Sequence, residues 1–100
     1  MNKLVILAVF TLLSFNLSAN EDTKYCKGMS KVAGQIMEFR QENTDMADLY
    51  ELLEDSQGAI IMISMAYKEP LYSTDEYKKR SIDTFKNTVF MICINSRLNA

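Results

Sequence analysis

The stretch KEPLYSTDE, residues 68–76, separates two helical segments of the chain and so decides the fold. Pro70 cannot continue a helix, and its ring also disfavours helical geometry at Glu69. Ser73 and Glu76 match a capping box, in which the Glu76 amide donates to the Ser73 hydroxyl and the Glu76 side chain accepts from the Ser73 amide. One helix is therefore predicted to end before Pro70, and another to begin just after Ser73.

The segments on either side of this break carry apolar residues every three or four positions, the period of an amphipathic helix. Downstream, the pattern predicts a helix over residues 74–97. Upstream, residues 45–67 form a second helical stretch, which the polar sequence DSQG at residues 55–58 interrupts. We expect either one kinked helix or two shorter helices there, with Ser56 able to begin the second.

The first helix of the domain is predicted over residues 22–41, with Asp22 or Thr23 as its N-cap. The polar residues 42–44 should end it. Nothing in residues 20–100 shows the alternation typical of a strand. The chain is therefore predicted to be all-α.

Residues 59–66 (AIIMISMA) are apolar nearly all round. Such a segment is usually a central core helix, or else half of an interface. From the spacing we expect Ile60, Ile61, Ser64 and Tyr67 on its buried side. Six methionines of the domain form an adaptable core or an adaptable binding groove, and the core is the expected role: Met29, Met37, Met46, Met62, Met65 and Met91.

The first nineteen residues have the three zones of a secretory signal peptide. Lys3 supplies the positive charge, residues 4–13 form an apolar run, and residues 14–19 end in small side chains. We therefore expect a leader over residues 1–19, with cleavage after Ala19.

The alternative to a cleaved leader is a membrane anchor. Residues 4–17 would span roughly 21 Å as a helix, which is short of a hydrocarbon core of roughly 30 Å. Lipid attachment at the cleavage site would require a cysteine where Asn20 stands. We therefore expect a single helical domain over residues 20–100, periplasmic or secreted, with no stable membrane insertion after cleavage.

The two cysteines, Cys26 and Cys93, lie 67 positions apart in the predicted domain. A domain this small has a marginal core, and an exported chain meets an oxidising compartment, so a disulfide between them is expected. An intermolecular bond and two buried thiols are the alternatives. An intramolecular bond requires the first and last helices to lie side by side and antiparallel. The predicted architecture is an all-α bundle of three to four helices, stapled by one disulfide linking the first and last helices.

Composition argues against several functions. Without Lys3, 10 basic residues face 13 acidic ones, a formal net charge of −3, which disfavours nucleic acid as a partner. The chain has no His, the commonest general base and metal ligand. The cysteines are too far apart for a reactive CxxC pair. We therefore predict no catalytic residues, no cofactor and no metal site, so the protein is not expected to be an enzyme.

Charge is segregated along the chain, since residues 41–67 contain six acids and no Lys or Arg. Four of these acids follow helical spacing and are predicted to form one negative stripe: Asp45, Asp48, Glu51 and Asp55. The stripe is either a solvated face or a patch that orients a basic partner. Like charges on one helix cost stability, which favours a use for them.

Three tyrosines, Tyr67, Tyr72 and Tyr77, bracket the turn at Pro70. They are candidates for capping and core packing. Tyrosine is also enriched in binding interfaces, because it combines apolar contact area with a polar tip. Together with the acidic stripe they are the candidate partner-binding residues.

A set of positions spread over the domain forms a further pattern: Cys26, Ile36, Met37, Arg40, Gln41, Ala66, Tyr67, Pro70, Tyr72, Ser73, Thr74, Phe85, Asn87 and Cys93. Its most specific part is AYKEPLYST, residues 66–74. The arrangement resembles small exported helical proteins of bacteria and their prophages that carry one pair of cysteines. The resemblance covers nearly all of residues 20–100 and implies a helical fold with one disulfide, but it transfers no activity and no functional residue.

These patterns together predict a small periplasmic or secreted module that binds an unidentified protein partner. An inhibitor, an immunity-type protein or a prophage exclusion protein would fit. The alternative is a periplasmic stress chaperone or holdase. The oligomeric state stays open, since residues 59–66 can be covered within one chain or by a homodimer.

Overall fold

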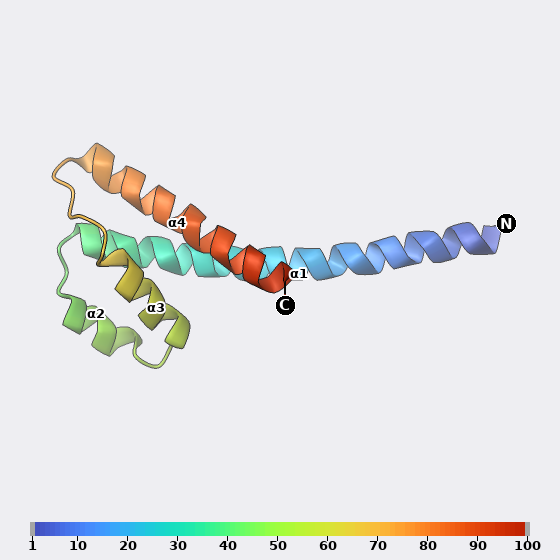
Figure 1. Cartoon of the computed structure of the whole chain (residues 1–100), viewed down its shortest axis with the longest axis horizontal. Helices are drawn as coiled ribbons and strands as arrows, with labels where there is room; N and C mark the ends of the chain where they lie inside the picture. Colours follow the sequence, from blue (N-terminus) through green and yellow to red (C-terminus); the bar gives the residue numbers. More distant parts are fainter. Residues whose placement is uncertain (1, 100) are drawn as a thin grey trace.

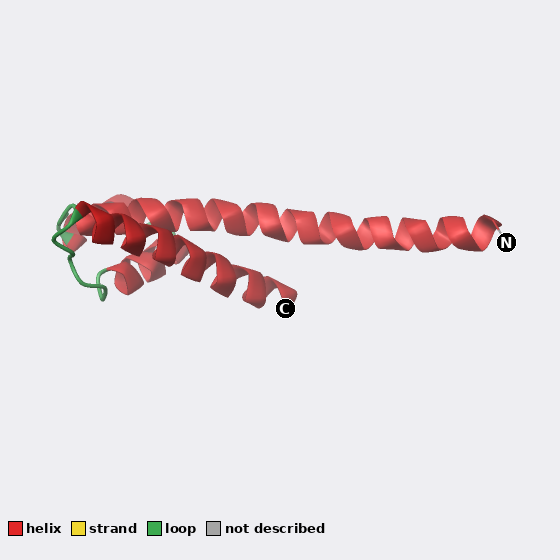
Figure 2. Cartoon of the chain, turned by 90° about the horizontal axis from the view of Figure 1, so that it is seen from above, coloured by secondary structure: helices red, strands yellow, loops and turns green. Residues whose placement is uncertain are grey.

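The structure, a computed structural model, describes the backbone of residues 2–99 and the side chains of residues 20–99. Within this part the chain is all-α and has no strand. Figure 1, and Figure 2 from above, show its helices in the order α1 (Asn2–Gln41), α2 (Met46–Leu53), α3 (Gln57–Ala66) and α4 (Asp75–Leu98). The prediction of three to four helices is therefore confirmed.

The start of α1 differs from the prediction. The helix begins at Asn2, so Asp22 and Thr23 lie inside it and cannot be N-caps. The reason is that no Pro or Gly precedes residue 22 to stop the helix. The predicted leader, residues 1–19, lies outside the residues whose side chains the structure describes. Figure 1 shows that this part of α1 extends beyond the end of α4.

The end of α1 is where the polar break was predicted. Asn43 has a φ of 61°, a left-handed conformation that Asn tolerates better than most residues. The Thr44 amide donates to the Phe39 carbonyl at 3.0 Å, and the Asn43 amide donates to the Arg40 carbonyl at 3.0 Å. These are the two bonds of a Schellman motif, which satisfy carbonyls at the helix end.

The middle of the chain forms two helices rather than one kinked helix. Asp45 caps α2, since its carboxylate accepts from the Ala47 amide at 3.4 Å. Ser56 caps α3, since its hydroxyl accepts from the Ala59 amide at 3.2 Å. The expectation that Ser56 begins a fresh helix is confirmed.

The cap of α4 lies one residue later than predicted. The Thr74 hydroxyl, not that of Ser73, accepts the capping hydrogen bond, from the Tyr77 amide at 3.2 Å. A cap at Thr74 puts both Asp75 and Glu76 in the first turn, where the helix dipole favours negative charge.

A disulfide joins Cys26 to Cys93, with Cα atoms 5.6 Å apart, so the predicted intramolecular pairing is confirmed. Figures 1 and 2 show α1 and α4 side by side and antiparallel. Their contact is the most extensive between any two described helices. The Ser30 hydroxyl also donates to the Lys86 carbonyl across this interface, at 3.0 Å.

The core lies where α1, α3 and α4 meet, with Leu49 reaching it from α2. On α3 the buried side chains are Ala59, Met62, Ile63 and Ala66. The predicted face was partly wrong, because Ile61 is 60% exposed and Ser64 is also exposed, whereas Ile60 and Tyr67 are half-buried. Periodicity cannot select a face in a segment that is apolar all round. The face that packs on α1 contains two alanines, whose small side chains let the helices approach closely.

Two glycines of α1 allow a matched test of the α1–α4 interface. A Cβ added at Gly34 would lie 2.8 Å from Cγ and Cδ of Lys86, whereas one added at Gly28 would meet nothing within 4 Å. Gly28→Ala is expected to raise the free energy of unfolding by about 1 kcal/mol through better helix propensity. Gly34→Ala should raise the free energy of unfolding by less, because the Lys86 side chain must move to make room for the new methyl group. If urea unfolding showed that both substitutions stabilise the protein equally, the close approach of Lys86 to Gly34 would be contradicted.

Candidate functional site

An apolar groove lies between α3 and α4. Both helices pack on α1 but make few contacts with each other. Figure 2 shows them on the same side of α1. Two adjoining pockets of about 340 Å³ and 410 Å³ occupy the space between them, and Met65 lines both. We call these two pockets together the α3–α4 groove.

The floor of the α3–α4 groove is apolar and rich in methionine. The residues that form it are Met29 and Met37 of α1, Met62 and Met65 of α3, and Phe85 and Val89 of α4. Methionine is unbranched and polarizable, so a methionine surface adapts to differently shaped apolar partners. The predicted core role is confirmed for Met37 and Met62, which are buried, but was wrong for Met46 and Met91, which are exposed.

Large apolar side chains stand at the edges of the α3–α4 groove. Ile61 of α3 is 60% exposed and Ile92 of α4 is 54% exposed, and both line the larger pocket. Tyr25 and Tyr77 are half exposed at its two ends. Contiguous apolar surface of this kind often marks a binding site.

Two arginines are held at opposite ends of the α3–α4 groove. Arg80 pairs with Glu76 at 3.4 Å and lies over the ring of Tyr77, 5.3 Å from its centroid. Arg97 pairs with Asp22 at 3.2 Å and lies 3.7 Å from the ring centroid of Tyr25. The Arg80–Glu76 pair is largely exposed and the Arg97–Asp22 pair is partly exposed, so both contribute little to stability.

The turn that closes one end of the groove is clamped by Gln41. This side chain is only 3% exposed. Its amide nitrogen donates to the Pro70 carbonyl at 2.9 Å, and its amide oxygen accepts from the Tyr72 backbone amide at 3.0 Å. Arg40 adds two hydrogen bonds to the Glu69 carbonyl, at 3.1 Å and 2.9 Å. The last turn of α1 thereby fixes the position of Tyr72.

The importance of Gln41 was missed in the sequence. One signal for it exists: Ala33, Met37 and Gln41 are spaced by four positions, so Gln41 continues the inward stripe of α1. A buried polar residue at the end of such a stripe must find hydrogen-bond partners.

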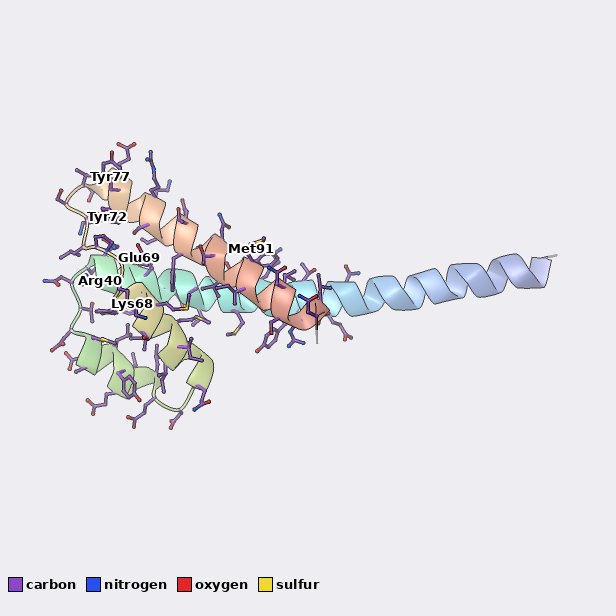
Figure 3. The ribbon with its side chains drawn as sticks, viewed as in Figure 1. Arg40, Lys68, Glu69, Tyr72, Tyr77 and Met91 are labelled. Carbon is purple, nitrogen blue, oxygen red and sulfur yellow. A yellow bond between two sulfur atoms is a disulfide. The ribbon has the colours of Figure 1, made fainter. Side chains whose placement is uncertain are left out.

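The three candidate tyrosines do not act together. Tyr72 and Tyr77 are stacked, with ring centroids 6.0 Å apart, and both line the groove. Tyr67 instead lies beneath Arg40, and its hydroxyl donates to the Thr44 carbonyl at 2.6 Å. Figure 3 places Tyr72 and Tyr77 beside the turn at one end of the molecule.

The four candidate acids are exposed and belong to a different surface. Asp48 and Glu51 lie on α2, but Asp45 is its cap and Asp55 follows its end at Leu53. The continuous helical stripe predicted for them is therefore interrupted. None of the four lines the α3–α4 groove, and none forms an ion pair with a described Lys or Arg.

The Tyr67 hydroxyl is expected to make the stability of the fold depend on pH in the alkaline range. Partial burial raises the pKa of its hydroxyl above the usual value, an effect that Arg40 opposes and Asp45 reinforces. A raised folded-state pKa stabilises the fold fully below the unfolded-state pKa of about 10, and this stability is lost as the pH rises through the folded-state pKa. Tyr67→Phe should cost about 1 kcal/mol at neutral pH through the lost hydrogen bond. When the pH rises from about 9 to about 11, the free energy of unfolding should fall less for Tyr67→Phe than for the wild type, because the variant has no hydroxyl to ionise. Urea unfolding at the two pH values measures both decreases. Equal decreases would contradict the prediction.

The fold and the groove together define a small, disulfide-stapled helical domain with one open apolar face between two of its helices. No protein-family model, curated protein or solved structure matches the chain. The resemblance seen in the sequence therefore stays a prediction. Among residues 20–99, no group of three potential metal ligands occurs and no helix is long and apolar enough to cross a membrane.

Proposed function

We propose that this protein is exported and acts by binding another protein in the α3–α4 groove, without catalysing a reaction. The observation that carries the proposal is the pair Ile61 and Ile92, which remain exposed beside a methionine-lined floor. These two side chains line the same pocket, and a partner bound there would cover both of them. An inhibitor or an immunity-type protein acts in this way.

Export is supported by two features. Residues 1–19 have the zones of a signal peptide, and the Cys26–Cys93 bond is of a kind that persists in oxidising compartments. We therefore propose a periplasmic or secreted location. Mass spectrometry of the protein from its natural host should find a chain that begins near Asn20 and contains the disulfide. An intact residue 1–19 segment, or two free thiols, would contradict this location.

Site-specific photo-crosslinking tests the binding site. A benzophenone amino acid placed at Ile92 in the exported protein is expected to give a discrete adduct with one partner in living cells. The matched control is Leu52, which is 72% exposed on α2 and lies outside the groove. No adduct at Ile92, or the same adduct from both positions, would contradict the proposal.

A holdase is the second candidate, and the methionine-rich floor favours it because adaptable surfaces accept many clients. It predicts concentration-dependent suppression of the aggregation of unrelated unfolded proteins, and a smear of adducts from Ile92. A discrete adduct together with no suppression of aggregation would instead support the dedicated binding module.

A further inference from the structure

We propose that the α3–α4 groove binds an amphipathic helix of a partner protein, and that acidic residues flank the apolar stripe of this helix. This inference rests on the proposed function and adds the chemistry of the partner. Three observations carry it: the arrangement of the three surrounding helices, the length of the groove, and the charges along it.

The shape of the site favours a helix. Residues of α1, α3 and α4 line the groove, and few contacts close the space between α3 and α4. A fourth helix laid along this space would complete a four-helix arrangement around the methionines. Such helix-in-groove binding is a recurrent mode of recognition. A strand would need a sheet edge to extend, and the described residues contain no sheet.

The length of the groove residues along α4 favours a long occupant over a short one. Groove residues on α4 run from Tyr77 to Arg97, a distance of roughly 30 Å at the helical rise. The acidic helix α2 of a second copy has 8 residues and would cover only about 12 Å. Its buried side chain, Leu49, is already packed in the core. A longer helix from another protein fits better than a second copy of this chain.

More of the charged side chains that line the groove are cationic than anionic, although the whole chain is acidic. The charged side chains that line it are Lys68, Arg80, Arg97 and Glu69, so three are cationic and one is anionic. The whole chain has a formal net charge of −2. Asp22 pairs with Arg97, so the accessible cations are Lys68, which makes no ion pair with any described carboxylate, and Arg80, whose pair with Glu76 is largely exposed. Acidic flanks on the partner helix would therefore meet available cations, whereas basic flanks would be repelled.

Two synthetic helical peptides of about 20 residues provide the test. They share one apolar stripe of Leu residues with a single Trp, and differ only in carrying Glu or Lys beside it. The protein has no Trp, so the peptide fluorescence reports binding directly. The disulfide-bonded protein, produced from the full chain with export, is expected to bind the Glu peptide at least tenfold more tightly than the Lys peptide. The preference should shrink at high salt.

Matched variants locate the effect. Arg80→Glu should remove most of the preference for the Glu peptide, whereas Lys79→Glu makes the same charge change one position away, outside the groove lining. Ile92→Arg should weaken binding of both peptides. Circular dichroism of each variant should stay that of the wild type.

The outcomes separate this inference from the proposed function. Equal binding of the two peptides, preference for the Lys peptide, or equal effects of Arg80→Glu and Lys79→Glu would overturn the acidic partner. The Ile92 adduct in cells would then still support protein binding. A stable dimer that blocks both peptides would show that a second copy occupies the groove, and would also overturn this inference.

Discussion

Removing the Cys26–Cys93 disulfide is expected to lower the free energy of unfolding by about 4 kcal/mol on the chain-entropy model. The bond closes a loop with a sequence separation of 67, so it removes much of the conformational freedom of the unfolded chain. A small domain has a total stability of about 5 to 15 kcal/mol, so the loss is a large part of the whole. Urea unfolding of the Cys26→Ala, Cys93→Ala double variant measures it.

Two controls belong to this experiment. The reduced wild-type protein should unfold at nearly the same urea concentration as the double variant. Met91→Ala, at a side chain that is 57% exposed on the same helix (Figure 3), should change the unfolding free energy little. A loss below about 1 kcal/mol on removing the bond would show that the unfolded chain is already compact or that the bond strains the fold.

Replacing Gln41 by Leu is expected to cost about 3 kcal/mol. The two side chains are similar in size, but Leu cannot hydrogen-bond to the Pro70 carbonyl or the Tyr72 amide. Each of these partly buried backbone groups would lose its partner, at a cost of about 1 to 3 kcal/mol each. Gln35→Leu is the matched control, because Gln35 is exposed on the same helix. Equal effects of the two substitutions would contradict the clamp.

Gln41→Glu separates the two halves of the clamp. An ionised carboxylate can accept from the Tyr72 amide but is repelled by the Pro70 carbonyl, so burial there should raise its pKa in the folded state. A raised folded-state pKa means that stability is full below the unfolded-state pKa, about 4.3 for Glu, and is lost as the pH rises through the folded-state pKa. The variant should therefore be closest to wild type in acid and weakest near neutral pH, as urea unfolding at the two pH values would show.

The sequence predicts the fold well because its breaks are local signals. Pro70, the polar residues 42–44 and Ser56 end or begin helices through properties of single residues. The cysteine pair then determines which helices are neighbours. The start of α1 was predicted wrongly, since no local signal stops a helix that runs on from an apolar segment. The buried face of α3 was predicted only in part, because a helix that is apolar all round is oriented only by the neighbour it packs against.

The candidate site was predicted only in part. Tyr72 and Tyr77 are neighbours in the structure because the turn at Pro70 is short, which is a local effect. The groove itself depends on α3 and α4 packing on α1 without closing on each other, and no pattern within one helix carries that information. The acids of α2 stood out in the sequence by their charge alone, yet they lie on another surface than the tyrosines at the groove.

Both ends of the α3–α4 groove are fixed in position. At one end the disulfide of Cys93, a residue that lines the groove, joins α4 to α1. At the other end Gln41 makes hydrogen bonds to the turn. A partner would therefore meet walls that are already in position, and association would have little flexibility to remove. The disulfide and the hydrogen bonds of Gln41 form at different times. The clamp can assemble as soon as the chain folds, but the sulfur bond has to wait for an oxidising compartment. If the protein is exported and the groove is its binding site, a newly made chain still in the cytoplasm would bind its partner weakly, and full affinity would arise only after the disulfide has formed.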